Sequence, residues 1–219
     1  MTKIYTIAID GDSAAGKGTL ARALAAALDF AYLDTGLLYR RTGFNLLKEN
    51  REITESTAAA AAAMVTLADL AEPSLRSDEV AQMASKVAVF AAVRQALLPI
   101  QHNFIAHPPG GKRGAVLDGR DIGTVICPSA DIKFYVTADP AIRAYRRQKE
   151  LQDSGITATT AQVLDDMLKR DTRDRTRSVA PTQMAEDAWP IDTSGQNPQT
   201  VLSQALAIVY RAIPQLAKQ

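Results

Sequence analysis

The sequence has almost no cysteine, almost no net charge and no long apolar run, and each absence excludes a class of protein. The single cysteine, Cys127, cannot form a disulfide within the chain, which favours a reducing compartment such as the cytoplasm. With 25 basic and 24 acidic residues the net charge is +1, so no bulk attraction to nucleic acid or to an anionic membrane is indicated. No apolar stretch reaches membrane-spanning length, and the first residues lack a signal-peptide pattern. We therefore expect a cytoplasmic monomer that binds neither nucleic acid nor membrane.

The composition suits one compact domain, since the chain has 219 residues of which 47% are hydrophobic. Short apolar runs alternate with helical stretches, which predicts an α/β fold with a parallel sheet covered on both faces by helices. In such sheets ligands bind at the carboxyl ends of the strands, and four of the five runs end at or just before an aspartate. The runs are residues 4–9, 30–33, 115–117, 132–136 and, less clearly, 188–191; the aspartates are Asp10, Asp34, Asp118 and Asp192. Asp10 and Asp192 have a second interpretation, as caps for the segments that follow them.

A glycine-bounded loop with a lysine follows the first of these runs and precedes a helix-like stretch, residues 19–28. Strand, loop and helix in this order predict a phosphate-binding loop (P-loop), because glycines let backbone N–H groups approach phosphate oxygens and the helix N-terminus adds positive partial charge. An ordinary turn is the alternative. The candidate contacts to nucleotide phosphates are Gly11, Asp12, Ser13, Ala14, Ala15, Gly16, Lys17, Gly18 and Thr19.

Two features narrow the kind of P-loop protein. The commonest pattern places Ser or Thr directly after the lysine, whereas here Gly18 comes first and Thr19 second, so direct ligation of Mg²⁺ by the hydroxyl is less secure. The chain also lacks an Asn/Thr-Lys-x-Asp segment of the guanine-reading kind, which disfavours a GTPase.

A long helical region, residues 36–106, interrupts the alternation and predicts a lobe over the sheet. Ser56 precedes the alanine run 58–63 and is a natural N-cap there, and Ser77 can cap the next helix. At the start of this region Thr35 is either an N-cap or a site residue. Arg40, five positions on, is either surface or part of a second anion site.

Two further charged clusters could complete a site. Asp118, Gly119, Arg120 and Asp121 follow the 115–117 run, where an aspartate of a P-loop protein often reaches magnesium through water; a tight turn with a local ion pair is the alternative. Later in the chain, Arg170, Arg173, Asp174 and Arg177 fall on one face of a helix at 100° per residue. Guanidinium groups bind phosphate oxygens bidentately, so this face indicates a lid that closes over polyphosphate, against the alternative of a solvated charged helix.

Taken together these segments resemble the bacterial cytidylate kinase family of P-loop nucleoside monophosphate kinases, along essentially the whole chain. The Asp-Gly-Arg-Asp segment with the arginine run is specific to that family, whereas the P-loop is shared by many. The resemblance implies a three-layer P-loop fold with a five-stranded parallel sheet flanked by helices, a helical lobe for the monophosphate and a short lid. We divide the single domain 1–219 into a core at about 1–38, 112–142 and 186–219, a monophosphate lobe at about 39–108 and a lid at about 143–182.

The resemblance also implies the activity, which is transfer of the γ-phosphate of ATP to CMP or dCMP, with Mg²⁺ accompanying ATP. It implies that Lys17, Arg120, Arg170 and Arg177 act in catalysis. The implied substrate-binding residues are Thr35, Tyr39 and Arg40 at the acceptor phosphate, Ser85, Arg94 and Asp121 at the cytosine edge, and Gly119, Arg120, Arg170, Asp174 and Arg177 around phosphates and sugar. Metal contact by Thr19 or Asp118 would pass through water.

Three details qualify this resemblance. Ser85 and Arg94 are nine residues apart, half a turn out of phase on one straight helix, so they can meet one base only if the helix breaks between them near residues 90–92. Residues 66–76 are too few and too poor in strand formers for the small antiparallel sheet of better-known family members, which predicts a reduced lobe. Asp12 stands where proline is frequent and brings an acidic group close to incoming phosphates.

The expected reaction is direct in-line phosphoryl transfer, which needs positioning and charge neutralisation and no general base. The nearest alternative is a P-loop kinase for another small acceptor, such as UMP, another nucleoside monophosphate or a shikimate-like hydroxyl compound. The alternative from another class is a module that binds ATP without catalysis. Arg146 and Arg147 are weaker candidates for holding the ATP side, since they can equally cover helix surface.

Overall fold

A five-stranded parallel sheet forms the centre of the computed structural model, which describes residues 3–153 and 155–217. The strands are β1 (Tyr5–Gly11), β2 (Ala31–Asp34), β3 (Gly114–Asp118), β4 (Ile132–Thr137) and β5 (Trp189–Asp192), in the order β2-β3-β1-β4-β5. Every neighbouring pair is parallel. All five predicted strands are therefore confirmed, and the α/β fold class with them. Asp34 and Asp118 face each other in register at the carboxyl ends of β2 and β3.

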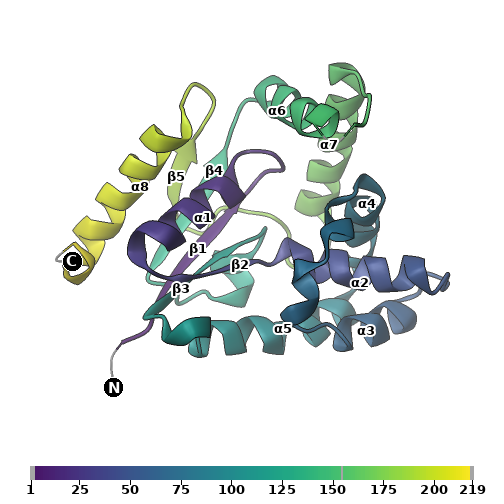
Figure 1. The fold of residues 1–219 in the computed structure, drawn as a ribbon, viewed down its shortest axis with the longest axis horizontal. Helices are drawn as coiled ribbons and strands as arrows, with labels where there is room; N and C mark the ends of the chain where they lie inside the picture. Colours follow the sequence, from purple (N-terminus) through teal and green to yellow (C-terminus); the bar gives the residue numbers. More distant parts are fainter. Residues whose placement is uncertain (1–2, 154, 218–219) are drawn as a thin grey trace.

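Alternate residues of the strands supply two separate hydrophobic cores. Ile7 and Ile9 of β1 pack with α1 (Lys17–Leu28) and α8 (Pro198–Ala212) on one face. Ala8 between them belongs to the other core, which contains buried residues of α2 (Gly36–Lys48), α3 (Glu55–Ala63), α4 (Asp78–Val87) and α5 (Ala91–Ala106). Because strand side chains alternate between faces, this pattern gives three layers, helix, sheet and helix (Figure 1).

The segment between β2 and β3 consists of helices and short connections and contains no strand among residues 35–113, all of which the structure describes. We expected residues 66–76 to lack the small antiparallel sheet of better-known family members. Two short 3₁₀ turns, η1 (Ala68–Ala71) and η2 (Pro73–Arg76), lie there instead. Ser77 caps α4 through its hydroxyl as predicted. The prediction for α3 was wrong: Thr54, not Ser56, is the N-cap, because Thr54 and Thr57 form a reciprocal capping box one turn earlier.

The predicted helix break between Ser85 and Arg94 is present. Helix α4 ends at Val87, α5 begins at Ala91 with Phe90 as its extended N-cap, and the segments on the two sides are bent by 105°. Within the described residues no single helix is long and apolar enough to cross a membrane; the bent pair passes such a test only when its two parts are counted together.

Two helices, α6 (Pro140–Asp153) and α7 (Thr160–Thr176), stand over the end of the sheet where the strands finish (Figure 1). They pack on each other through a small core that contains Ala144 and Met167. Short turns complete the chain: η3 (Pro109–Gly111), a π-helical turn η4 (Ile122–Ile126) and η5 (Pro214–Leu216). Helix α7 ends at Thr176, and Arg177 is extended with φ −62° and ψ 142°.

Candidate active site

A cavity of about 690 Å³ opens at the carboxyl ends of the strands, between the P-loop, the helical lobe and α7. Residues from all four predicted clusters line it, so segments far apart in the sequence meet here. From the predicted set these are Ser13, Ala14, Gly16, Lys17, Gly18, Thr19, Thr35, Tyr39, Arg40, Ser85, Arg94, Gly119, Arg120, Asp121, Arg170, Asp174 and Arg177. Gly11, Asp12 and Ala15 are buried beside it and do not line it.

The P-loop requires glycine where β1 passes into it. Gly11 has φ +136°, and a Cβ there would lie 1.9 Å from the carbonyl oxygen of Val136. The loop ends at Gly16, the N-cap of α1, so the free N–H groups of the first helical turn face the cavity end of the sheet. Lys17 is buried, and its Nζ donates to the carbonyl oxygen of Asp12 at 2.5 Å.

The space beside Gly18 explains why the usual hydroxyl residue is absent at this position. A Cβ on Gly18 would lie 3.3 Å from Asp118 Oδ2, 3.4 Å from Arg22 Nη1 and 3.6 Å from the Tyr32 hydroxyl. A serine or threonine Cβ would be tight against the Asp118 carboxylate, which would have to shift by a few tenths of an ångström. Thr19, the next residue, is exposed and lines the cavity.

Asp118 and Lys17 form a buried pair of opposite charges whose pKa values shift in opposite directions. Burial, with the nearby Asp34 carboxylate, raises the pKa of Asp118, which also accepts a hydrogen bond from the Tyr32 hydroxyl at 3.2 Å. Burial, with the Arg120 guanidinium, lowers the pKa of Lys17. The charged lysine is therefore poorly solvated in the free protein, and an anionic ligand would stabilise it.

The oxygen donors here fit a hard divalent cation that keeps most of its waters. Asp34 and Asp118 supply carboxylates and Thr19 a hydroxyl, all on the cavity wall. In the described part of the chain, no three His, Cys, Asp or Glu side chains gather as a cage for a metal ion. Mg²⁺ is typically bound by one or two carboxylates together with substrate phosphates, which is compatible with this donor set.

The residues predicted for the acceptor phosphate lie at the junction of sheet and lobe. Thr35 donates from its hydroxyl to the Asp118 carbonyl oxygen at 2.8 Å. Arg40 donates to the carbonyl oxygens of Leu75 and Ser77 at 2.8 and 3.3 Å, so the lobe holds it while it lines the cavity. The Tyr39 ring lies under the Arg94 guanidinium, 5.5 Å from ring centre to Cζ, and burial raises the pKa of Tyr39 to about 12.

The three residues predicted for the base edge also converge. The bend between α4 and α5 directs Ser85 and Arg94 to the same cavity. Arg94 forms an ion pair with Asp121, and each side chain is only 7% exposed. Arg177 approaches the other oxygen of Asp121 at 3.6 Å.

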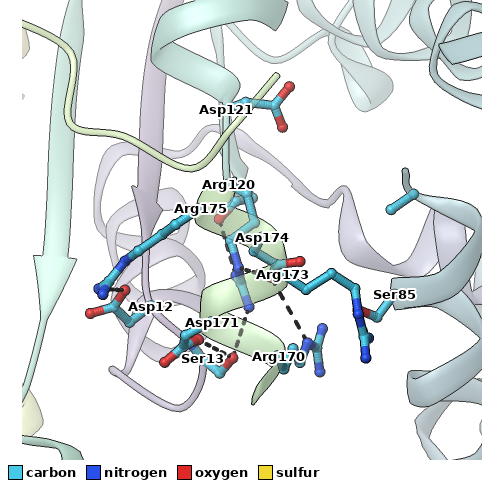
Figure 2. A network of polar contacts seen from close by, with 12 residues as sticks. Asp12, Ser13, Ser85, Arg120, Asp121, Arg170, Asp171, Arg173, Asp174 and Arg175 are labelled. Carbon is cyan, nitrogen blue, oxygen red and sulfur yellow. Dashed lines mark hydrogen bonds and ion pairs between the residues drawn. The ribbon is translucent and has the colours of Figure 1, made fainter. Parts of the chain in front are cut away.

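Arginines from two segments surround Asp174 (Figure 2). Arg120 donates from Nε to Asp174 at 3.1 Å and from Nη2 to the Ser13 hydroxyl at 3.2 Å. Arg170 lies 4.0 Å from the same carboxylate, and burial together with Arg120 lowers its pKa to about 10. One part of the sequence prediction was wrong: Arg177 lies beyond the end of α7 and does not share its helical face, because the chain turns to extended backbone there.

Sequence reasoning missed three buried or half-buried contacts of the lid. Arg143 of α6 and Asp171 of α7 form an ion pair at 2.5 Å, and Asp171 accepts from the Ser13 hydroxyl at 2.9 Å. Arg175 pairs with Asp12 at 2.5 Å. Arg143 and Asp171 are 28 positions apart in the sequence, and Arg175 and Asp12 are 163 apart, so no local pattern indicates these pairs.

Four residues with open interpretations have partners within the protein. Asp10 accepts from the backbone N–H groups of Ile122 and Gly123, both at 2.7 Å, and burial raises its pKa to about 6. Asp192 accepts from Ser194, so it caps the segment that follows it, whereas the partners of Asp10 lie at the start of the distant turn η4 and not in the loop after β1. Arg146 and Arg147 both line the cavity; Arg146 donates to Thr193, and Arg147 pairs with Asp78 of α4 at 3.2 Å.

Comparison with known proteins gives one consistent family. The model of the cytidylate kinase family matches residues 7–211. A cytidylate kinase of Paramagnetospirillum magneticum is 53% identical over 204 residues, covering 93% of this chain and 96% of that protein. One of Rhodospirillum rubrum is 48% identical with the same coverage. Among solved structures, a protein of Thermus thermophilus aligns with a TM-score of 0.54 at 18% identity, covering 96% of this chain and 98% of that one, a likeness of fold.

Proposed function

This chain belongs to the cytidylate kinase family, and we propose that its cavity is the place where the γ-phosphate of ATP passes to CMP or dCMP, giving ADP and CDP or dCDP. Phosphorylation of CMP by ATP follows from the family; use of dCMP and the assignment of residues are the proposal. The observation that carries it is the meeting in one cavity of four cationic side chains with a buried carboxylate. The cations are Lys17, Arg120, Arg170 and Arg177, and the carboxylate is Asp121.

The donor and acceptor occupy opposite sides of this cavity. ATP places its phosphates on the loop Gly11–Thr19, where backbone N–H groups, the α1 N-terminus and Lys17 face them. The acceptor places its phosphate near Thr35, Tyr39 and Arg40, which lie at the start of the lobe and line the same cavity. Asp174 lies between the arginines and would receive the sugar hydroxyls.

The cytosine edge is read by Ser85, Arg94 and Asp121. Asp121 accepts from the exocyclic amine, while Ser85 and Arg94 donate to the ring nitrogen and carbonyl. Uracil lacks the amine, so a buried Asp121 would lose its donor, and such losses discriminate strongly between ligands.

The reaction needs no covalent intermediate and no general base, because the acceptor phosphate oxygen is already ionised. Lys17, Arg120, Arg170 and Arg177 neutralise charge that spreads over the transferring group. Mg²⁺, held through water by Asp118 and Thr19, would neutralise charge on the ATP phosphates. Closure of the lid, residues 143–182, over the lobe, residues 39–108, would exclude water and suppress hydrolysis of ATP.

We place the activity in the cytoplasm, as a step of pyrimidine nucleotide metabolism catalysed by a monomer. The lone cysteine supports the reducing compartment, and the near-neutral charge gives no reason for a nucleic-acid or membrane partner. The core at residues 1–38, 112–142 and 186–219 would stay rigid while lobe and lid move.

A coupled assay of ADP release across CMP, dCMP, UMP, AMP, GMP and shikimate tests the proposal. We expect the highest kcat/KM with CMP or dCMP. Faster turnover of UMP, another acceptor or shikimate would replace the assigned substrate, and ATP binding without acceptor-dependent ADP release would indicate a non-catalytic module.

A further inference from the structure

Ser85 lies between the cavity and helix α7. Its side chain lines the cavity and is 4% exposed, and its Oγ accepts a hydrogen bond of 2.7 Å from Nη1 of Arg173. Arg173 belongs to α7, and Figure 2 shows its side chain extending to Ser85; Arg173 is not among the residues that line the cavity. We propose that Arg173 fixes the hydrogen-bonding direction of the Ser85 hydroxyl and is thereby a positioning residue for base selectivity; this rests on the proposed function.

The three side chains proposed to read the base differ in whether they donate or accept hydrogen bonds. Arg94 can only donate, and the ionised Asp121 can only accept. The hydroxyl of Ser85 can do either, so a freely rotating Ser85 is the member of this set that could serve more than one base. Cytosine presents an acceptor at N3, whereas uracil presents an N–H donor there. A site selective for cytosine therefore needs Ser85 to act as a donor.

A guanidinium that donates to Ser85 supplies this constraint. It occupies one of the two acceptor positions of Oγ with a charge-assisted bond, which leaves one hydrogen and one lone pair. Because hydrogen bonds in a chain polarise one another, donation from a cation makes the O–H a stronger donor and the remaining lone pair a weaker acceptor. The hydroxyl is thus biased to donate into the cavity, toward N3 of cytosine.

The position of Arg173 argues against an ordinary surface charge. Lys169, one turn earlier on α7, is 67% exposed and pairs with Asp165 on its own helix. Arg173 instead reaches a residue 88 positions earlier, in the helical lobe. The contact needs α7 to face α4, so selectivity for the base would be complete only when the lid lies over the lobe.

The test compares Arg173→Met with Lys169→Met, which removes the same charge from the same helix. For each folded variant kcat/KM is measured with CMP, UMP and 3-deaza-CMP, in which carbon replaces N3. We expect Arg173→Met to lower the CMP-to-UMP ratio about fivefold and to reduce the penalty for 3-deaza-CMP by a similar factor. Arg173→Lys should restore part of both effects, and Lys169→Met should change neither.

The proposal is overturned if Arg173→Met leaves the CMP-to-UMP ratio and the 3-deaza penalty at wild-type values. It is also overturned if the variant lowers kcat/KM for all three substrates by the same factor, as loss of lid closure would. If Arg173→Met does not melt cooperatively, Arg173→Gln, which keeps a donor without the charge, is judged by the same two ratios. Failure of the wild type to turn over CMP would instead refute the proposed function, so the two outcomes are separate.

Discussion

Lys17 donates a hydrogen bond of 2.5 Å to the carbonyl oxygen of Asp12, five residues earlier in the same loop. The ammonium group therefore stays inside the P-loop, where it is buried and close to the Arg120 guanidinium. The lysine is the proposed ligand of the ATP phosphates, and burial lowers its pKa in the free protein. This combination is typical of a site that gives up stability to bind charge.

The variant Lys17→Met should lose activity and gain stability. We expect kcat to fall at least about a hundredfold, because a cation that stabilises the transition state is removed. The pKa of Lys17 is lower in the folded state than in the unfolded state, so between these two pKa values the unfolded state binds a proton that the folded state does not, and the protein loses stability as pH falls. Without this lysine, the variant should unfold at a higher urea concentration near pH 7. Steady-state kinetics and urea unfolding measure the two effects. Unchanged kcat, or lower stability than wild type, would contradict the assignment; Lys169→Met serves as the control.

Neutralising Asp121 should weaken the preference for cytosine. In Asp121→Asn the amide can present N–H to uracil, so the kcat/KM ratio of CMP to UMP should drop about tenfold or more. Arg94 and Arg177 also lose a buried counter-charge, so the variant should be less stable by about 2 kcal/mol. The ratio is measured at a temperature where the variant remains folded, and an unchanged ratio would remove Asp121 from the base site.

The pair of Asp12 and Arg175 should keep an acidic group from repelling ATP. Asp12 is 4% exposed, and one of its oxygens is held by Arg175 while the other accepts from Thr137. Arg175→Met leaves this carboxylate uncompensated beside the phosphates, and we expect KM for ATP to rise about fivefold. Adding Asp12→Asn should return KM close to the wild-type value.

Arg211→Met, an exposed arginine of α8, is the matched control for loss of one positive charge. An Arg175→Met enzyme with wild-type KM for ATP would show that Asp12 is screened by other means. A double variant that remains impaired would assign Arg175 a contact of its own with the nucleotide.

Asp10 should make the protein less stable as pH rises from about 4 to 6. Its pKa is raised by burial from 3.8 to about 6, so the folded state holds a proton that the unfolded state has lost in this range. Unfolding free energy then decreases with pH, by about 3 kcal/mol over the window for this group. In Asp10→Asn that contribution is absent. Urea unfolding of both proteins at a series of pH values measures the difference, and parallel curves would show that Asp10 does not titrate there.

The sequence predicted those parts of the site that depend on local pattern. The five strands follow from apolar runs, and the P-loop between β1 and α1 follows from its glycines and lysine in the order strand, loop, helix. The break between Ser85 and Arg94 was expected only because the family resemblance assigns both residues to one base, which helix phase forbids on a straight helix. The contacts of the lid could not be predicted from local sequence pattern. Asp171 and Arg175 look like members of one charged run, and only the packing of α6 and α7 over the P-loop shows that they contact Ser13 and Asp12.

The error over Arg177 has the same origin. Helix phase extrapolates correctly only while the helix continues, and nothing within the arginine run itself marks Thr176 as the last helical residue. The Arg177 side chain reaches Asp121 because the backbone leaves the helix there. The helical placement of Arg177 was therefore wrong, while its proposed contact with phosphates stays a prediction.

Helix α7 touches the P-loop through Asp171, the loop after β3 through Asp174 and the helical lobe through Arg173. These attachments lie within about one helical turn, so on the proposed function the helix would uncover both nucleotide sites together. Departure of ADP and of the new diphosphate should therefore wait on the same slow rupture of these charge-assisted hydrogen bonds, one of which is the ion pair of Arg120 and Asp174. In single-turnover experiments we expect both products to escape with one shared rate constant, and that rate to quicken with added salt.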